Sequence, residues 1–304
     1  MPWKHWNSDR IGVALAVLAA FGFSFKAIFV KLAYAAAPVD AVTLLSLRMV
    51  FSLPAFLWIG FTAGNAVPLT RRDWGTLVVL GVLGYYASSM LDFLGLQYIS
   101  AGLERLILFT YPTLTVLIGV LFMGQSLEKR QVGALLLSYA GIGLAFAHDL
   151  QLGGDVATLL TGAAFVFGSA LTYAIYSAGA EPAIRRLGSA RFAALAMLVS
   201  TTATQLHFFA TQPLTALVQP LPIYLYGAAM ALFSTVLPIL WQSAAIRRIG
   251  AARSVLIGTL GPVLTIFFSW WLLQEPVSTN QLAGAALVLG GVLLVGRSKR
   301  KEGT

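Results

Sequence analysis

Four charged side chains lie within segments that are otherwise apolar: Lys26 and Lys31 in SFKAIFVKLAY, Arg48 in LLSLRMVFSLP and Asp92 in SSMLDFLGLQY. A charged group costs about 3 kcal/mol at the centre of a membrane-spanning helix, so it is retained where it pairs or binds a ligand. Of these, Lys26, Arg48 and Asp92 together carry a single positive charge. This combination favours an anionic group such as a carboxylate, with Asp92 available for an amine or a proton.

The composition identifies the setting of these charges. Hydrophobic residues make up 58% of the 304 residues and charged residues only 10%, which predicts an all-α integral membrane protein. The net charge of +9 comes from short basic clusters between apolar runs, so we expect no nucleic-acid partner. The chain has no cysteine and only three histidines, which argues against disulfides, a metal centre and a cofactor.

Apolar runs separated by Gly, Pro and charges predict ten transmembrane helices. They cover residues 11–34, 41–62, 75–98, 101–124, 131–148, 156–178, 192–212, 222–245, 254–274 and 282–296. The first run precedes AAAP at 35–38 and has some features of a secretory signal. Its apolar core is too long for a signal and contains lysines, so we expect an uncleaved first span.

Basic residues predict the orientation of these helices, because cytoplasmic loops collect Lys and Arg. With the N-terminus inside, sixteen of the 20 Lys and Arg fall in inner segments, whereas Arg105 lies near an outer end. The sixteen are Lys4, Arg10, Arg71, Arg72, Lys129, Arg130, Arg185, Arg186, Arg191, Arg247, Arg248, Arg253, Arg297, Lys299, Arg300 and Lys301. We expect a multi-pass protein of the inner (plasma) membrane with both termini cytoplasmic.

An internal repeat relates residues that are 150 positions apart, as Pro112 and Pro262 are. SAGLERLILFTYPTLTVLIG aligns without a gap on GAARSVLIGTLGPVLTIFFS. Each half holds five predicted spans, an odd number, so the second half enters the membrane from the opposite side. The expected domains are a first repeat over 11–148 and a second, inverted repeat over 156–296, an architecture typical of transporters.

Several short motifs resemble a known family. They are Lys31, Pro38 and Arg48 in the first two spans, the P-x-L-T pattern at Pro112 and Pro262, and LLQEP at 272–276. Over nearly the whole chain they resemble the EamA branch of the drug/metabolite transporter superfamily. The resemblance implies two inverted five-helix halves around a central cavity that exports small metabolites, as in YddG-like aromatic or threonine/homoserine exporters. One departure is Gln125, where the family has a glutamate that Glu275 keeps in the second half.

Helix geometry gives the charges a common depth. Lys26, Arg48 and Asp92 each fall about 9–12 Å below the outer end of their span, at 1.5 Å per residue. We therefore expect them to meet in the cavity, with Lys26 binding a substrate carboxylate. Alternative roles are structural: Lys31 and Arg48 can join helices or reach the headgroups, and Asp92 can simply neutralise a cation.

Further residues are predicted to line the cavity. Tyr85, Ser88 and Asp92 recur at helical spacing on one face of the third span, together with Gly81 and Gly95. The repeat places Gln242 opposite Asp92, beside Trp241, and Tyr111 adds another aromatic group. Close helix packing is the alternative explanation for the small and aromatic residues.

Pro112 and Pro262 are candidate hinges, because each removes a backbone donor near the middle of its span. The alternative is a passive kink, which is common in membrane helices.

The expected function is a secondary transporter that exports small amphipathic metabolites, most readily amino acids, by alternating access. Uptake of another small organic anion or metabolite, or a passive channel, are the alternatives. An integral-membrane enzyme lacks support, because the sequence has no metal-binding spacing and no Gly-rich phosphate loop. The expected partners are a small-molecule substrate and the lipid bilayer. Proton coupling and facilitated diffusion both stay open, and the fused halves predict function as a monomer.

Overall fold

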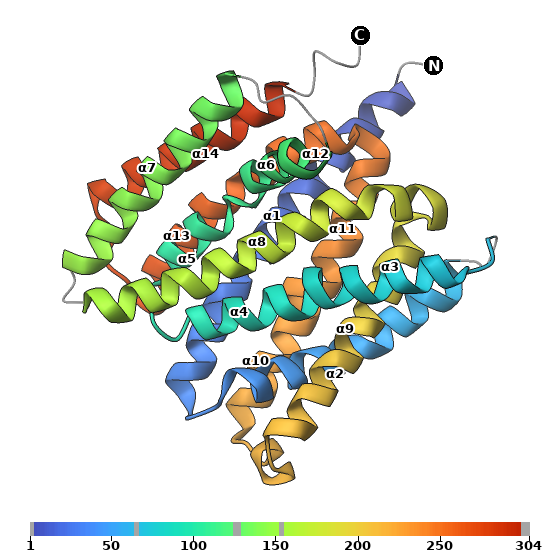
Figure 1. Cartoon of the computed structure of the whole chain (residues 1–304), viewed down its shortest axis with the longest axis horizontal. Helices are drawn as coiled ribbons and strands as arrows, with labels where there is room; N and C mark the ends of the chain where they lie inside the picture. Colours follow the sequence, from blue (N-terminus) through green and yellow to red (C-terminus); the bar gives the residue numbers. More distant parts are fainter. Residues whose placement is uncertain (1–2, 64–66, 124–128, 152–154, 299–304) are drawn as a thin grey trace.

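The computed structural model describes residues 3–63, 67–123, 129–151 and 155–298, and the regular elements within them are helical (Figure 1). They form ten spans, as predicted. The first half contains α1 (Trp3–Ala36), α2 (Ala41–Thr62), α3 (Arg71–Gly81), η1 (Val82–Ala87), α4 (Ser88–Gly95), α5 (Ala101–Leu108), α6 (Tyr111–Met123) and α7 (Lys129–Gln151). The second contains α8 (Val156–Leu187), α9 (Ser189–Thr211), η2 (Leu214–Leu217), α10 (Leu221–Ala231), η3 (Leu232–Val236), α11 (Leu237–Ile249), α12 (Ala251–Gly258), α13 (Leu260–Leu273) and α14 (Thr279–Ser298).

The outer surface of the bundle is suited to lipid. Eight helical spans in the described part of the chain are long and apolar enough to cross a membrane, and two further apolar helices are shorter. Large side chains such as Phe61, Phe122 and Trp58 are 82%, 81% and 71% exposed. Side chains of this size favour hydrocarbon over water, so their exposure is stabilising only in a bilayer.

Polar side chains cap the N-termini of several helices. Asp40 Oδ1 accepts a hydrogen bond from the Thr43 N–H at 2.8 Å at the start of α2. At the start of α3, Thr70 and Asp73 form a reciprocal capping box. The first N–H groups of a helix lack intrahelical acceptors, and such groups are costly near hydrocarbon. These caps therefore determine where the spans begin.

The two halves are inverted, because equivalent helices run antiparallel. A Cβ added to Gly141 of α7 would lie 2.5 Å from the Gly284 oxygen of α14, and one added to Gly291 would lie 2.6 Å from the Ala134 oxygen. Residues late in α7 thus contact residues early in α14, so the two helices lie side by side and antiparallel (Figure 1). Small residues let the two backbones approach closely.

The same inversion relates α2 and α9. Ser46 Oγ donates a hydrogen bond to Gln205 Oε1 at 2.8 Å, near the start of α2 and the end of α9. At the other end of the pair, a Cβ added to Gly60 would lie 3.6 Å from the Ala194 side chain. Equivalent helices of the two halves therefore pack against each other as antiparallel pairs.

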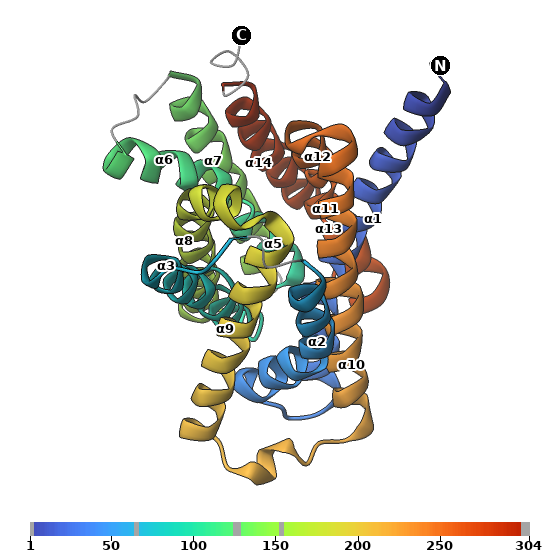
Figure 2. The same cartoon turned by 90° about the vertical axis from the view of Figure 1, so that its right-hand side faces the viewer.

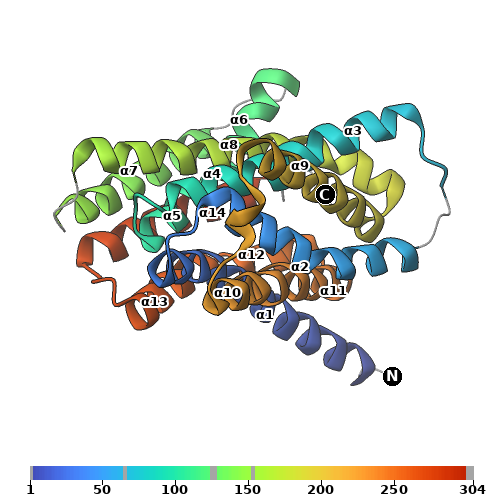
Figure 3. The same cartoon turned by 90° about the horizontal axis from the view of Figure 1, so that it is seen from below.

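Helices of the two halves also form two mixed packing groups. In one group α1 packs against α10 and α11, and in the other α8 packs against α3 and α4 (Figure 3). A Cβ added to Gly12 would contact Ile249, and one added to Gly162 would contact Ile99. The two contacts are equivalent, because Gly162 lies 150 residues after Gly12 and Ile249 lies 150 residues after Ile99. The repeat thus extends to the first span of each half.

Helix irregularities occur at equivalent positions. The π-helical segments η1 and η3 begin at Val82 and Leu232, again 150 residues apart. The fourth span is interrupted at Phe109 and Thr110, and the ninth at Thr259. Each interruption directly precedes the helix that contains the predicted hinge proline.

Two boundaries differ clearly from the prediction, and one of them is the start of α1, which lies at Trp3 rather than at residue 11. α8 continues to Leu187, beyond the expected end at 178. The extension carries Glu181 and Arg185, whose side chains form an ion pair at 2.5 Å. These charges end the apolar pattern without ending the helix, because pairs four residues apart stabilise helical structure outside the bilayer. Gln125 lies outside the described residues.

The contact between α7 and α14 yields a stability prediction. Gly141→Ala forces a methyl group against the Gly284 backbone, so we expect overpacking to destabilise the fold by about 1–3 kcal/mol. Thermal unfolding in detergent measures the effect as a lower Tm. The matched control is Gly143→Ala two residues away, where an added Cβ meets nothing within 4 Å. An equal Tm for the two variants would contradict the close antiparallel contact.

Candidate functional site

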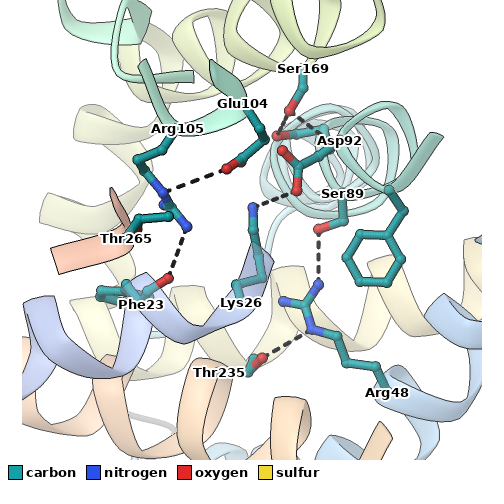
Figure 4. Close-up of polar contacts among 12 residues, drawn as sticks. Phe23, Lys26, Arg48, Ser89, Asp92, Glu104, Arg105, Ser169, Thr235 and Thr265 are labelled. Atoms are coloured by element: carbon teal, nitrogen blue, oxygen red, sulfur yellow. Dashed lines mark hydrogen bonds and ion pairs between the residues drawn. The ribbon is translucent and has the colours of Figure 1, made fainter. Parts of the chain in front are cut away.

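Lys26 and Asp92 form a buried ion pair, as their expected common depth implies. The Lys26 Nζ lies 2.8 Å from the Asp92 Oδ2 (Figure 4). The Asp92 side chain is completely buried, whereas that of Lys26 is 17% exposed. Because Lys26 belongs to α1 and Asp92 to α4, the pair joins the two mixed packing groups.

Arg48 lies in the same region, but its charge is not paired. Its Nε donates a hydrogen bond to Thr235 Oγ1 at 3.0 Å, and its Nη1 donates to Ser89 Oγ at 3.3 Å (Figure 4). The guanidinium carbon also lies 5.7 Å from the centroid of the Phe93 ring. No carboxylate in the described part of the chain forms an ion pair with Arg48. A buried cation whose hydrogen-bond partners are neutral hydroxyl groups still attracts an anion strongly.

A second pair, Glu104 and Arg105, was not assigned to the site from the sequence. The Arg105 Nε lies 3.6 Å from the Glu104 Oε2, and its Nη2 donates to the Phe23 carbonyl at 3.1 Å (Figure 4). Both side chains are buried. Arg105 thus lies close to the start of α5, but neighbouring helices cover it, so its side chain is not exposed at that end of the bundle. The sequence did contain a signal for this pair, because Glu104 and Arg105 are adjacent charges near the start of an otherwise apolar span.

The two pairs meet through their carboxyl groups. The carboxyl groups of Asp92 and Glu104 are close enough to interact (Figure 4), and both side chains have 0% exposure. Glu104 is therefore a second acid deep in the bundle, beside Asp92. Together with Lys26, Arg48 and Arg105, they form what we call the charge cluster: three cations and two carboxyl groups within one buried region.

The predicted aromatic residues lie together, joined by tyrosines that the sequence did not single out. Tyr85 Oη lies 2.9 Å from Tyr176 Oη, in a hydrogen bond between η1 and α8. Tyr111 packs edge-on against Tyr173 with ring centroids 4.8 Å apart, and Tyr173 packs against Tyr176 at 5.4 Å. α8 thus connects Tyr85 with Tyr111 and forms an aromatic wall.

The remaining predicted residues differ in their surroundings. The Ser88 Oγ lies 3.1 Å from the Ser169 Oγ, and Ser169 Oγ donates to the Ser88 carbonyl at 2.8 Å, so these side chains join α4 to α8. Trp241 and Gln242 are half-buried on α11. No hydrogen bond, ion pair or ring contact links either of them to the charge cluster within the described residues. The structure thus groups most of the predicted site but not its second-half members.

A separate cavity of about 500 Å³ opens at the distal end of the bundle, which is the end opposite the start of α1. Figure 2 shows the start of α1 and the end of α14 at the other end. Six of the lining residues are Lys31, Tyr34, Pro38, Gln97, Leu273 and Glu275. Lys31, which carries part of the family resemblance, therefore lies at the mouth of the bundle rather than in the charge cluster.

Carboxyl groups hold the start of α5 at this distal end. Glu275 Oε1 accepts a hydrogen bond from the Ala101 N–H at 3.1 Å, and Asp149 Oδ2 accepts one from the Ser100 N–H at 3.1 Å. Negative groups are favoured at a helix N-terminus. Burial raises the pKa of Glu275, and the nearby charge of Lys31 opposes that shift. Within the described residues, no group of three His, Asp or Glu side chains is arranged to hold a metal.

Two inverted five-helix halves with buried charges between them define an integral membrane transporter. The chain belongs to the EamA-like transporter family, which matches residues 10–147 and 160–297, one copy in each half. It is therefore a multi-pass membrane transporter of the drug/metabolite transporter superfamily and not an enzyme.

Similar proteins cover the whole fold. An uncharacterized transporter, YcbK of Bacillus subtilis, is 29% identical over 93% of this chain and 91% of its own length. A probable amino-acid metabolite efflux pump of Salmonella typhimurium is 25% identical over 93% of each chain. A solved crystal structure matches with a TM-score of 0.64 over 98% of this chain and 99% of the other, at 18% identity, which supports the fold.

The interrupted spans yield a prediction about the hinges. Pro112→Ala and Pro262→Ala restore a backbone donor just after each interruption, so we expect straighter helices that slow transport while sparing substrate binding. Initial rates and binding affinity, measured on the same reconstituted protein, separate the two effects. Pro54→Ala is the control, because α2 continues unbroken through Pro54. Equal losses of binding and transport would refute the hinge role.

Proposed function

We propose that this transporter exports small amphipathic metabolites, most readily amino acids, by alternating access. The observation that carries the proposal is the buried Arg48, whose charge has hydroxyl partners but no carboxylate among the described residues. Such a cation favours a substrate that brings its own carboxylate. The relative described as an amino-acid metabolite efflux pump supports this substrate class.

The charge cluster supplies the proposed recognition of the substrate. Lys26 is the partly exposed member of its ion pair, so it is the more accessible group for a substrate carboxylate. Arg48 adds a second positive group, and Asp92 balances the pair. In this proposal Tyr85 and Tyr111 contact an apolar side chain of the substrate, and Trp241 and Gln242 supply further contacts from the second half as the halves move.

The positions of the charges support alternating access. Lys26 and Asp92 come from different packing groups, and Arg48 contacts η3 as well as α4. A substrate that enters between these groups replaces contacts that hold them together. Its binding therefore changes the free energy of the closed arrangement, which is the requirement for a ligand-driven shift between conformations.

We place the transporter in the inner (plasma) membrane as a functional monomer, with both termini cytoplasmic. The start of α1 and the end of α14 lie at the same end of the bundle, and basic residues concentrate in the segments assigned to that side (Figure 2).

The topology predicts the behaviour of reporter fusions. A fluorescent protein that matures only in the cytoplasm should be bright at either terminus, and alkaline phosphatase should be inactive there. Alkaline phosphatase inserted after Leu217, in the distal loop between α9 and α10, is the opposite control and should be active. Active phosphatase at a terminus would reverse the orientation.

Substitution of Lys26 tests the proposed function. Lys26→Ala should lower the kcat/KM for carboxylate substrates by roughly 10- to 100-fold in reconstituted vesicles, the scale of one charge-assisted hydrogen bond. Substrates with an amidated carboxylate should lose less, and Lys26→Arg should retain more activity. Thermal unfolding verifies folding, since the change leaves Asp92 without its cation.

The control for this test is Lys129→Ala, because Lys129 is exposed at the start of α7. Saturable counterflow of labelled amino acid distinguishes a carrier from a passive channel. Wild-type rate and apparent affinity in a folded Lys26→Ala protein would make Lys26 a structural residue, and the assignment would fail.

A further inference from the structure

The carboxyl groups of Asp92 and Glu104 form an unusual contact. Both side chains have 0% exposure, and their carboxyl groups are close enough to interact (Figure 4). Apart from the ion pairs of Asp92 with Lys26 and of Glu104 with Arg105, no donor in the described part of the chain bonds to their four oxygens. A hydrogen bond between two carboxyl groups requires a proton on one of them, and two adjacent carboxylates repel each other strongly when both are ionised.

The surrounding groups do not remove the need for that proton. Lys26 is in contact with Asp92, and Arg105 is 3.6 Å from Glu104, while Arg48 and Tyr34 lie near Asp92 without bonding to it. The neighbouring elements add uncharged groups from α8 and the two carboxyl groups at the start of α5. These groups are Ser169, Tyr173, Tyr176, Asp149 and Glu275.

The Lys26–Asp92 pair also has the charges that complement a zwitterion. Lysine matches the carboxylate of an amino acid, and aspartate matches its ammonium group. An amino acid that inserts between them would replace one internal ion pair with two pairs of its own. The incoming ammonium would bring a positive charge to the carboxyl pair, where the proton had been the compensating charge.

We propose that Asp92 and Glu104 together hold one proton in the empty transporter and release it when the ammonium group of an amino acid binds beside Asp92. The inference rests on the proposed function and adds that amino-acid transport is coupled to proton movement. The proton leaves to water on the side from which the substrate enters, and no bond is made or broken in the substrate. After the amino acid is released on the other side, the empty transporter takes up a proton there and returns with it. Each cycle therefore exchanges one amino acid for one proton.

Two physical consequences distinguish this exchange from uncoupled diffusion. Because binding releases a proton, amino-acid affinity should rise as pH rises, by up to tenfold per pH unit while the pair is protonated. Because the zwitterion carries no net charge, exchange for a proton should also move one positive charge across the membrane in each cycle.

The experiment measures proton release upon binding by the full-length protein in detergent. Titration calorimetry in phosphate and in Tris, which differ in ionisation enthalpy, counts the protons released as L-phenylalanine or L-threonine binds. We expect about one proton for each bound amino acid. The carboxylate 3-phenylpropionate, which lacks the ammonium group, should bind without releasing a proton.

Variants assign the proton to the pair. Glu104→Gln keeps a donor for Asp92 and preserves side-chain size, so it should bind phenylalanine with no proton release and with an affinity independent of pH. Glu275→Gln is the matched control, because Glu275 is a carboxyl group that contacts the backbone of α5 rather than Asp92. It should release the proton as the wild type does.

Each outcome decides a separate question. Binding of phenylalanine without proton release in the wild type, or full release in Glu104→Gln, would overturn the proton site while leaving the proposed function intact. Absence of binding by both amino acids in the folded wild type would instead refute amino-acid transport itself, and the coupling with it. Equal proton release with 3-phenylpropionate would overturn the role of the ammonium group.

Discussion

A charge buried in a membrane protein needs a partner, and the Lys26–Asp92 pair is where this requirement shapes the bundle. The 2.8 Å contact joins α1 to α4, so it holds together two packing groups that each combine helices from both halves. Arg48 lies across the same boundary, with hydroxyl groups from η3 and α4 as its partners. The interface that must rearrange during transport is thus held by charged and polar contacts, which a polar substrate can replace more readily than apolar packing.

The inverted repeat provides the scaffold, and departures from the repeat provide the chemistry. Glycine contacts, π-helical segments and interrupted spans recur at equivalent positions in the two halves. The charge cluster does not recur. The positions 150 residues after Lys26, Asp92 and Glu104 hold Tyr176, Gln242 and Ser254, so the second half replaces each charge with a neutral group. Symmetric helices allow two related conformations. The charges come from the first half alone, so a bound substrate meets charged groups on one side of the site and neutral groups on the other.

Polar contacts hold the start of α5 in place at the distal end. Asp149 reaches it from the end of α7 and Glu275 from the connection between α13 and α14, so both halves contribute. Glu104 lies one turn further along the same helix. A movement that frees the start of α5 would therefore also displace a member of the charge cluster, which links the state of the site to the closure of this end.

The sequence alone determined the membrane setting, the ten spans, the inverted repeat and the family, because apolar length, charge clusters and a fixed spacing are one-dimensional properties. Helical rise also predicted a shared depth for Lys26 and Asp92, since depth depends only on position along each span. Tertiary structure decided which side chains face each other around the helix axes. It brought Glu104 and Arg105 into the charge cluster, because burial of the start of α5 depends on helices that are distant in the chain. It left Gln242 outside the cluster, because the direction in which a side chain points depends on how its helix packs.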